Sequence, residues 1–339
     1  MSKCKHGRQS YVFEKQPVIT VWSSVAGKKE SEGPLGKLFD ITMQDSYFGQ
    51  KSWELAEKRM QQLALQEILR KKEMRNTDLD LVLSGDLLNQ CIGSSFTLRN
   101  TGIPHLGLYG ACSTMAESLL LGSFFVSGGY CDNVVAMTSS HFASSERQYR
   151  FPLGYGGQRT PTSQWTVTGA GAVLLNSEGR GPKVESCTIG SVTDLGIKDA
   201  NDMGSAMAPA AFDTIMTHFK NTETSFDDYD LVITGDLSKV GHSVLFDLFR
   251  SKGIETDAKL SDCGLLVYNL NEQPVFSGGS GCACSMIATI ASIFPKMIKG
   301  EFKRVLVAAT GALHSPVMVQ QKDSIPCISH CVVYERTDL

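Results

Sequence analysis

The chain has 339 residues, 42% hydrophobic and 20% charged, and its 32 basic and 35 acidic residues leave a formal net charge of −3. This composition is typical of a folded globular protein and excludes a fibrous or disordered chain. The balanced charge argues against a large electrostatic surface for nucleic acid, so we expect no nucleic-acid partner. A chain of this length is expected to hold two core units, fused or packed together.

Neither the N-terminus nor the longest uncharged stretch predicts a membrane-directed segment. The start, MSKCKHGRQSYVFEK, is basic but has no apolar run behind it, which argues against a secretory signal peptide. The stretch 274–295 is continuously apolar only over 286–294, whereas a membrane-spanning helix needs ~20 apolar residues. We therefore expect neither a signal peptide nor a transmembrane segment.

The ten cysteines are scattered through apolar segments, which favours a reducing compartment with buried thiols. Two close pairs, Cys282 with Cys284 and Cys327 with Cys331, lack the spacing of a zinc knuckle and have no His/Cys partner pair. The acidic segment 194–204 lacks the calcium-loop pattern of an EF-hand. We therefore predict no metal site and no cofactor.

Helical and strand patterns follow one another along the chain. Apolar residues recur at helical spacing between Ser52 and Lys72, with Ser52 as the expected N-cap and basic residues in the last turn. Short β-type runs around Val82 and Val232, each followed by Ser/Thr-Gly-Asp, predict central strands buried on both faces of a sheet. The stretch 114–127 is apolar nearly all round, which predicts a helix buried on every side.

Several of these patterns occur twice, which indicates an internal duplication. The run LVLSGDL at 81–87 is echoed by LVITGDL at 231–237, an offset of 150 residues. GACSTM at 110–115 is echoed by CACSMI at 282–287, with Cys112 over Cys284 and an offset of 172. The same offset relates the apolar strands predicted over 133–140 and 305–312.

The duplication predicts two βαβ layers that enclose central helices, one over 114–127 and its repeat mate over 286–298. We divide the chain into an N-terminal half over 1–180, which carries Cys112, and a C-terminal half over 225–339. The segment 181–224 between them is expected to connect the halves and to pack on the core.

Cys112 is a candidate reactive residue because of its place in the predicted fold. It lies in the break YGACST between a short apolar strand over 106–109 and the buried helix that follows. A thiol at a helix N-terminus lies at the positive end of the helix dipole, which favours the thiolate and makes the residue a candidate nucleophile or anion contact. A buried structural cysteine is the alternative interpretation.

A duplicated βαβ core with Gly-Ala-Cys-Ser at the start of a central helix resembles the thiolase and ketoacyl-synthase superfamily. The resemblance implies an α/β fold layered α-β-α-β-α, with the Cys as acyl acceptor. More narrowly, runs along nearly the whole chain closely resemble the stage V sporulation protein AD family. Among them are EGPLGKLFD (32–40), SGDLLNQ (84–90), TSSHFASSERQYRFP (138–152), DLGIKDANDMGSAMAPAA (194–211) and GGSGCACS (278–285).

The positions at which condensing enzymes of this superfamily carry a His, and an Asn or second His, hold other residues here. Asp236 occupies the first position and Ser280 the second, while His242 lies six positions beyond Asp236. Condensation needs hydrogen-bond donors at a developing oxyanion, and an ionised Asp would repel that charge. We therefore expect Cys112 to remain as a pocket residue in a protein that is not an enzyme.

The resemblance implies a role in binding dipicolinic acid, a pyridine ring with two carboxylates. Such a ligand needs a flat apolar slot and donors such as arginines or backbone N–H groups at helix N-termini. Arg147 and Arg150 follow a predicted strand whose end carries His141, where site residues of α/β folds collect. Asp194 is expected to line the pocket or to order its loop. The candidate ligand-binding residues are Cys112, His141, Arg147, Arg150, Asp194, Asp236 and Ser280.

For the arginines, solvated ion pairs are the alternative, and for His141 a neutral core histidine. The expected function is non-catalytic binding of dipicolinic acid, for its uptake into the developing spore as part of the stage V A protein assembly. An acyl-transferring enzyme that uses Cys112 and a structural protein with a relic pocket are the alternatives. The resemblance also implies a homodimer paired through an edge strand. Because no spanning segment is expected, partner proteins, including membrane components, would hold the chain on the forespore or spore inner membrane.

Overall fold

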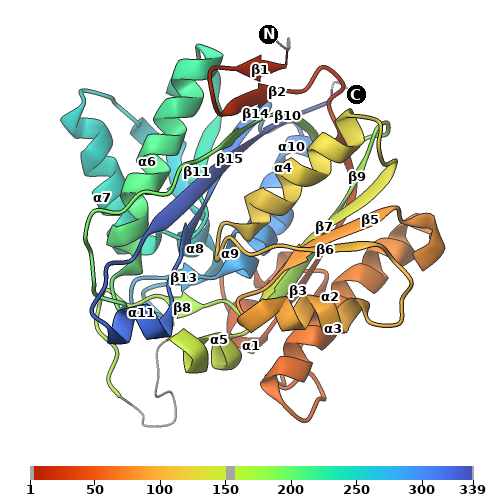
Figure 1. Cartoon of the computed structure of the whole chain (residues 1–339), viewed down its shortest axis with the longest axis horizontal. Coiled ribbons are helices and arrows are strands. Elements are labelled where there is room, and N and C mark those ends of the chain that lie inside the picture. Colours follow the sequence, from red (N-terminus) through yellow and green to blue (C-terminus); the bar gives the residue numbers. More distant parts are fainter. Residues whose placement is uncertain (1–3, 150–156, 338–339) are drawn as a thin grey trace.

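The computed structural model describes residues 4–149 and 157–337, and strands from both halves of the chain form one large sheet. The first half contributes β3 (Val18–Ala26), β5 (Leu81–Gly85), β6 (His105–Gly107), β7 (Asn133–Ser140) and β9 (Gly169–Asn176). The second half, together with β10 (Lys183–Ile189) of the segment 181–224, contributes β11 (Leu231–Thr234), β12 (Leu260–Asp262), β14 (Arg304–Ala312) and β15 (Cys327–Glu335). Their order in the sheet is β12-β11-β14-β15-β10-β3-β9-β7-β5-β6 (Figure 1).

This strand order repeats on the two sides of the sheet centre. From the centre outward, each half places its first, fifth, fourth, second and third main strand in turn. The halves meet where β10 pairs with β3 at Lys183 and Val18. Within each half, the second strand runs parallel to its two neighbours, β5 to β6 and β7, and β11 to β12 and β14.

Equivalent hydrogen bonds also recur in the two halves. Asp80, just before β5, accepts from the backbone N–H groups of Asp132 and Asn133, both at 2.8 Å. Asp230, just before β11, accepts in the same way from Lys303 at 2.6 Å and Arg304 at 2.9 Å. Each carboxylate thus fixes the start of the neighbouring parallel strand, which explains why an Asp precedes both copies of the repeated strand.

The helices form three layers, which α2 (Trp53–Lys72), α4 (Thr114–Ser127) and α6 (Met203–Thr222) define. In the middle, α4 packs on β5 and β7 of the first half and on β14 and β15 of the second. Outside, α2 covers β3, β7 and β9, and α6 covers β10, β14 and β15 (Figure 1). The predicted α-β-α-β-α layering is therefore confirmed. The segment 181–224 contains β10 and α6, which hold the places in the second half that β3 and α2 hold in the first.

Apart from α7, which is as long as α4, the remaining helices and strands are short. The helices are α1 (Lys28–Ser31), α3 (Ile92–Leu98), α5 (Phe142–Tyr149), α7 (Ser238–Ser251), α8 (Cys263–Val267), α9 (Cys282–Ala288), α10 (Phe294–Ile298) and α11 (Pro316–Gln320). The strands are β1 (Lys5–His6), β2 (Ser10–Val12), β4 (Ile41–Thr42), β8 (Trp165–Thr166) and β13 (Gly279–Ser280). A π-helical turn over 289–293 joins α9 to α10, and together they run beside α4 in the middle layer.

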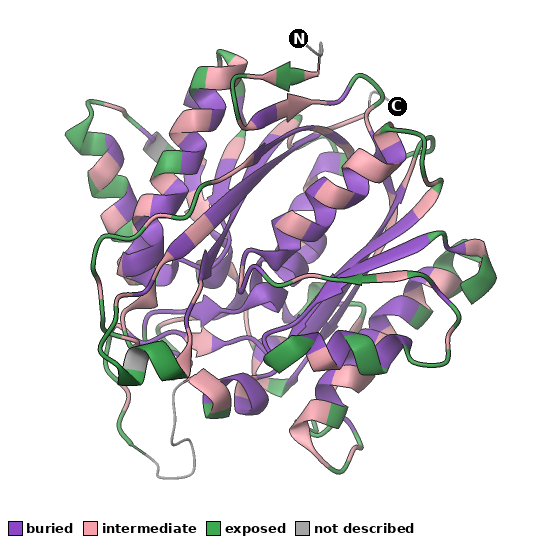
Figure 2. Cartoon of the chain, viewed as in Figure 1, coloured by how far each residue is buried: buried purple, intermediate pink, exposed green. Residues whose placement is uncertain are grey.

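Burial follows the layers. Figure 2 shows the central strands mostly in the colour of buried residues and the middle helix α4 in the colours of buried and intermediate residues, with exposed residues on the outer helices and loops. Met115 and Leu119 of α4 have no exposed surface, as expected for a helix that is apolar nearly all round. Within the described ranges, no helix is both long enough and apolar enough to cross a bilayer.

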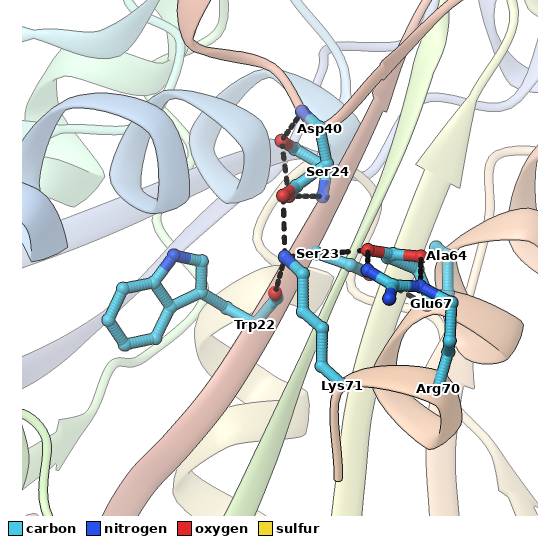
Figure 3. A network of polar contacts seen from close by, with 8 residues as sticks. All are labelled: Trp22, Ser23, Ser24, Asp40, Ala64, Glu67, Arg70 and Lys71. Carbon is cyan, nitrogen blue, oxygen red and sulfur yellow. Dashed lines mark hydrogen bonds and ion pairs between the residues drawn. The ribbon is translucent and has the colours of Figure 1, made fainter. Parts of the chain in front are cut away.

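Polar contacts tie the outer helix α2 to the sheet (Figure 3). Ser52 caps its start by accepting a hydrogen bond from the Leu55 N–H, as predicted. At its far end Lys71 donates to the Trp22 carbonyl oxygen at 2.8 Å and pairs with Asp40. Ser23 donates to the Ala64 carbonyl oxygen at 2.7 Å. The Lys71 and Ser23 contacts attach α2 to β3.

Candidate functional site

Cys112 lies in a tight turn between β6 and α4. Its neighbour Ala111 has a φ of 51°, in the left-handed region that non-glycine residues rarely adopt. The Thr114 hydroxyl stabilises the turn, because it donates to the Ala111 carbonyl oxygen at 2.7 Å and accepts from the Gly110 N–H at 3.0 Å. Such locally unfavourable backbone is common at functional sites.

The end of β14 passes directly behind this turn. A Cβ atom on Gly311 would lie 2.2 Å from the carbonyl oxygen of Gly110 and 3.1 Å from the nitrogen of Ser113. Only a glycine allows the two backbones to approach so closely. The glycine therefore brings the last strand of the parallel set in the second half against the start of the central helix of the first half.

Asp236 and Ser280 lie beside Cys112, although they come from separate segments of the second half. Asp236 follows β11 and Ser280 ends β13. The Ser280 hydroxyl lies 4.0 Å from the Cys112 sulfur and donates to Asp236 Oδ2 at 3.0 Å. Asp236 also accepts from the Gly281 N–H at 3.0 Å and from the Thr310 hydroxyl at 2.7 Å. The carboxyl group is thus fully surrounded by donors.

Burial controls the protonation of this group. It raises the pKa of the Asp236 carboxyl, although the hydrogen bonds that it accepts counteract this effect. Burial also raises the pKa of the Cys112 thiol well above its ordinary value, and the nearby negative charge of Asp236 adds to the increase. The environment therefore favours the neutral thiol, whatever the helix dipole contributes.

A largely apolar cavity of about 40 Å³ lies over Cys112. Ser280 lies opposite Thr166, because β13 pairs with β8, and both residues line the cavity. The residues that line it are Leu87, Tyr109, Ala111, Cys112, Ser145, Glu146, Tyr149, Thr166, Met203, Met207, Ser280, Ala312 and His314. The lining includes methionines of α6 and the end of β14, so both halves of the chain build the cavity.

Aromatic side chains cover part of this cavity. The hydroxyl groups of Tyr109 and Tyr149 are hydrogen-bonded to each other. Tyr149 also contacts the Leu87 carbonyl oxygen, with 2.6 Å between the two oxygens. The His314 ring lies edge-on to Tyr149, with 5.7 Å between ring centroids and an angle of 82° between ring planes. The cavity therefore combines apolar surface, phenolic hydroxyls and one imidazole.

His141 lies at the end of β7, as the strand pattern indicated, but it does not line this cavity. It is 1% exposed, and its Nε2 is 2.8 Å from the Ser46 carbonyl oxygen while its Nδ1 accepts from the Ala143 N–H. Because a backbone N–H donates to Nδ1, the ring proton sits on Nε2. Burial lowers the pKa of His141, so the neutral core histidine that we considered as the alternative describes its surroundings.

Two other predicted residues also lie away from the Cys112 cavity. Arg147 is half exposed and pairs with Glu54 at the start of α2, and its guanidinium lies 5.5 Å from the centre of the Trp53 ring. Asp194 is exposed and accepts from the Ser324 hydroxyl at 2.6 Å and from the Gly196 N–H at 2.8 Å, which lowers its pKa. Arg150 lies outside the described residues.

Asp194 does line a neighbouring cavity of about 140 Å³, which shares His314 with the Cys112 cavity. His242, the other histidine considered, lies in α7, and burial lowers its pKa.

Over residues 4–149 and 157–337, no group of three or more His, Cys, Asp or Glu side chains is arranged to hold a metal ion.

Comparison with known proteins places this cavity in a family context. The sequence profile of the Stage V sporulation protein AD (SpoVAD) family matches residues 7–335. The chain belongs to this family. Stage V sporulation protein AD of Bacillus subtilis (strain 168) is 48% identical over 330 residues, which cover 97% of each chain. The resemblance identified from the sequence motifs is therefore confirmed along nearly the whole length of the chain.

Solved structures show the same fold at low sequence identity. The 3-oxoacyl-[acyl-carrier-protein] synthase III of Aquifex aeolicus VF5 superposes with a TM-score of 0.57 and 14% identity, covering 94% of this chain and 99% of that one. The corresponding enzyme of Pseudomonas aeruginosa PAO1 gives 0.56 and 11%, covering 96% and 99%. This SpoVAD family member therefore has the thiolase-like fold of these synthases, which at such identity concerns the fold alone.

Several cavity residues were missed by reasoning from the sequence. His314 follows the end of β14 almost where His141 follows β7, so the repeat offset of 172 contained a signal for it. Glu146 and Tyr149 lie on the same short helix as Arg147, but helical phase directs them to the cavity and Arg147 to the surface. Met203 and Met207 come from the segment that was interpreted as a connection.

Proposed function

We propose that the chain is a non-catalytic binding protein for dipicolinic acid. In this proposal it acts in the uptake of dipicolinate into the developing spore, as part of the stage V A protein assembly. The observation that carries the proposal is the pairing of Cys112 with Asp236 and Ser280, in a fold whose enzymes need donors beside this cysteine. Membership of the sporulation family supports the biological setting.

The composition of the cavity supports an aromatic ligand. Leu87, Ala111, Met207 and Ala312 offer apolar surface for a flat ring, and the methionines can adapt to its outline. Tyr109, Tyr149 and His314 bring polar groups to the same space. A planar ring with carboxylates needs this combination of apolar walls and a few hydrogen-bonding groups.

Acyl transfer remains the second candidate, because the cysteine lies just before a central helix in a fold shared with oxoacyl synthases. Three observations count against it. The pKa of Cys112 is raised, whereas a nucleophilic thiol needs a lowered one. Asp236 is an acceptor when ionised, and the Ser280 hydroxyl donates to that carboxyl group. A developing oxyanion would therefore find few free donors around the sulfur.

Calorimetric titration tests the proposal. Wild-type protein is titrated with dipicolinic acid and, separately, with picolinic acid, which keeps the ring and lacks one carboxylate. We expect saturable binding of dipicolinate that is much weaker for picolinate. Cys112→Met, which extends an apolar side chain into the cavity, should abolish this binding, while Cys112→Ser should retain it. Absence of saturable dipicolinate binding to folded wild type would rule the proposal out.

A second experiment distinguishes the binding protein from an acyl-transferring enzyme. Mass spectrometry of protein incubated with acyl-CoA donors would reveal an acyl adduct on Cys112 if the thiol were a working acyl acceptor. We expect none. An adduct that disappears in Cys112→Ser, together with no dipicolinate binding, would favour acyl transfer.

We further propose that the protein forms a homodimer through β6 and lies on the forespore or spore inner membrane by binding other stage V A proteins, including membrane components. β6 is the last strand of the sheet on the side of the first half, and Leu106 within it is 46% exposed. An unpaired edge strand with an exposed apolar side chain favours pairing with a second copy. The absence of a spanning helix among the described residues is compatible with attachment through partners.

A further inference from the structure

A cluster of cations and aromatic rings lies beside the cavity wall. Phe142 and Trp165 stack, with 3.9 Å between centroids and 12° between ring planes. The Lys29 ammonium lies 3.7 Å from the centre of the Trp165 ring. The Arg159 guanidinium carbon lies 5.4 Å from the Phe142 centroid, 5.1 Å from Trp165 and 6.0 Å from Phe276. We call these five residues the Arg159 cluster.

One ion pair joins the Arg159 cluster to the Cys112 cavity. Arg159 donates from Nη2 to Glu146 Oε2, and Glu146 is 1% exposed in this pair. The Thr166 hydroxyl donates to the other oxygen of Glu146 at 2.9 Å. Glu146 and Thr166 both line the cavity. Glu146 and Thr166 are therefore part of the cavity wall, and Arg159, which is not among the lining residues, holds Glu146 from outside it.

Arg159 has an unused donor. Its Nη1 is buried and has no hydrogen-bond partner among the residues that the structure describes. Buried polar groups are almost always paired, and an unpaired one is unfavourable. A guanidinium offers donors in a fixed planar fork that fits a carboxylate. With no partner among residues 4–149 and 157–337, Nη1 is thus a place at which an external carboxylate oxygen would complete the hydrogen bonding.

The two cations of the Arg159 cluster repel each other. Lys29 and Arg159 bring two positive charges, and Glu146 is already engaged by Arg159. Glu30, next to Lys29, is buried and accepts from the Tyr268 hydroxyl and the Thr168 N–H; burial raises its pKa, and these hydrogen bonds oppose the increase. Burial is the largest effect on the pKa of Lys29 and lowers it; the negative charges of Glu30 and Glu32 oppose this effect, and repulsion from Arg159 adds to it. An anion between the two cations would relieve that repulsion.

We propose that Lys29 and Arg159 form a carboxylate-binding site outside the cavity wall, which captures an aromatic carboxylate between the Lys29 ammonium and Arg159 Nη1. Phe276, which is 39% exposed, supplies apolar surface for the ring of the ligand. The choice of a pyridine carboxylate as ligand rests on the proposed function. The site would hold the anion before it reaches the cavity, and competition with Glu146 for Arg159 would loosen the wall between the two.

Chemical labelling of Lys29 tests the site directly. Protein is treated by reductive methylation with and without millimolar picolinate, and the modification of each lysine is measured by peptide mass spectrometry. We expect picolinate to slow methylation of Lys29 by about fivefold or more and to leave Lys28 unchanged. Lys28 is the internal control, because it adjoins Lys29 and is exposed beside Glu32. Arg159→Gln should abolish the protection. Equal labelling of Lys29 with and without picolinate would overturn the proposal.

A second readout covers the case in which Arg159→Gln destabilises the wall. Lys29→Gln leaves the Arg159–Glu146 pair intact, and it should weaken dipicolinate binding about tenfold in calorimetry and flatten the dependence on salt. Lys28→Gln and Arg250→Gln, at exposed positions, are the matched controls. Wild-type affinity and salt dependence in Lys29→Gln would contradict the inference. If wild type gives no dipicolinate signal at all, the proposed function fails, and the labelling with picolinate decides the carboxylate site alone.

Discussion

Ser280 donates its hydroxyl proton to Asp236 Oδ2 at 3.0 Å, although its oxygen lies only 4.0 Å from the Cys112 sulfur. A hydroxyl has one proton, so this hydrogen bond removes it from a substrate oxygen near the sulfur. Asp236 collects two further donors, from Gly281 and Thr310. The polar groups beside Cys112 are therefore organised around a carboxyl group and not around the thiol.

Replacing Asp236 by Asn should make the Cys112 thiol more acidic. The negative charge of Asp236 contributes to the raised pKa of Cys112, and Asn removes that charge while its oxygen can still accept from Ser280 and Gly281. We expect alkylation of Cys112 by iodoacetamide, followed by peptide mass spectrometry, to become faster at a given pH, with its pH profile shifted to lower pH. An unchanged pH profile would show that Asp236 has no electrostatic influence on the thiol. Asp247→Asn, at an exposed position, serves as control.

Gly311→Ala should disturb the turn that carries Cys112. The new methyl carbon would lie 2.2 Å from the Gly110 carbonyl oxygen, so β14 or the turn must move. We expect a loss of about 2 kcal/mol in the free energy of unfolding, measured by urea denaturation, together with weaker dipicolinate binding. Gly157→Ala is the matched control, since a Cβ atom there meets nothing within 4 Å. Equal stability of the two variants would refute the steric argument.

The layers of the fold could be predicted because the repeated sequence motifs include residues that hold the strands in place. Asp80 and Asp230 precede equivalent strands, and each accepts hydrogen bonds from the start of the equivalent neighbouring strand, β7 or β14. The continuous apolar pattern of 114–127 was sufficient to predict α4 with its observed bounds. The duplication was hardest to see at α6, because this helix shares no obvious motif with α2 although it holds the equivalent place.

The candidate site was only partly predictable, for a physical reason. Cys112 and Asp236 lie within repeated motifs and Ser280 lies just before one, and the ends of parallel strands converge, so their proximity could be inferred. The position of Arg147 depends on the phase of a helix that is eight residues long, α5, which directs Arg147 toward Glu54 and Glu146 toward the cavity. Such a phase depends on packing that the local sequence does not reveal.

The proposed dimer can be tested at Leu106. A charged side chain on an edge strand opposes pairing with another edge, so Leu106→Lys should convert a dimer to a monomer. Light scattering at micromolar protein should then show half the mass of wild type. The melting curve of Leu106→Lys should match that of wild type, which shows that the variant is folded. Leu195→Lys, at another exposed apolar position, is the control. A wild type that already has monomer mass would refute the dimer.

The final prediction concerns the buried carboxyl pair Glu57 and Asp86. Glu57 accepts from the hydroxyls of Ser139 and Ser144, both at 2.9 Å, and no cation is among its hydrogen-bond partners in the described chain. Burial, and next the negative charge of Asp86, raise the pKa of Glu57 from 4.5 to about 8. Burial also raises the pKa of Asp86. The folded state therefore holds a proton on Glu57 that the unfolded chain releases near pH 4.5.

The sign of the effect follows from this difference. Below pH 4.5 both states are protonated, and between pH 4.5 and about 8 only the unfolded state loses the proton, so folding stability decreases as the pH rises through this window. Glu57→Gln cannot ionise and should remove much of this decrease, with a gain on the order of 3 kcal/mol over wild type at pH 8 relative to pH 4. Urea denaturation at the two pH values measures it, with Glu14→Gln as an exposed control. A variant that loses stability with pH as steeply as wild type would show that Glu57 is already ionised in the folded protein.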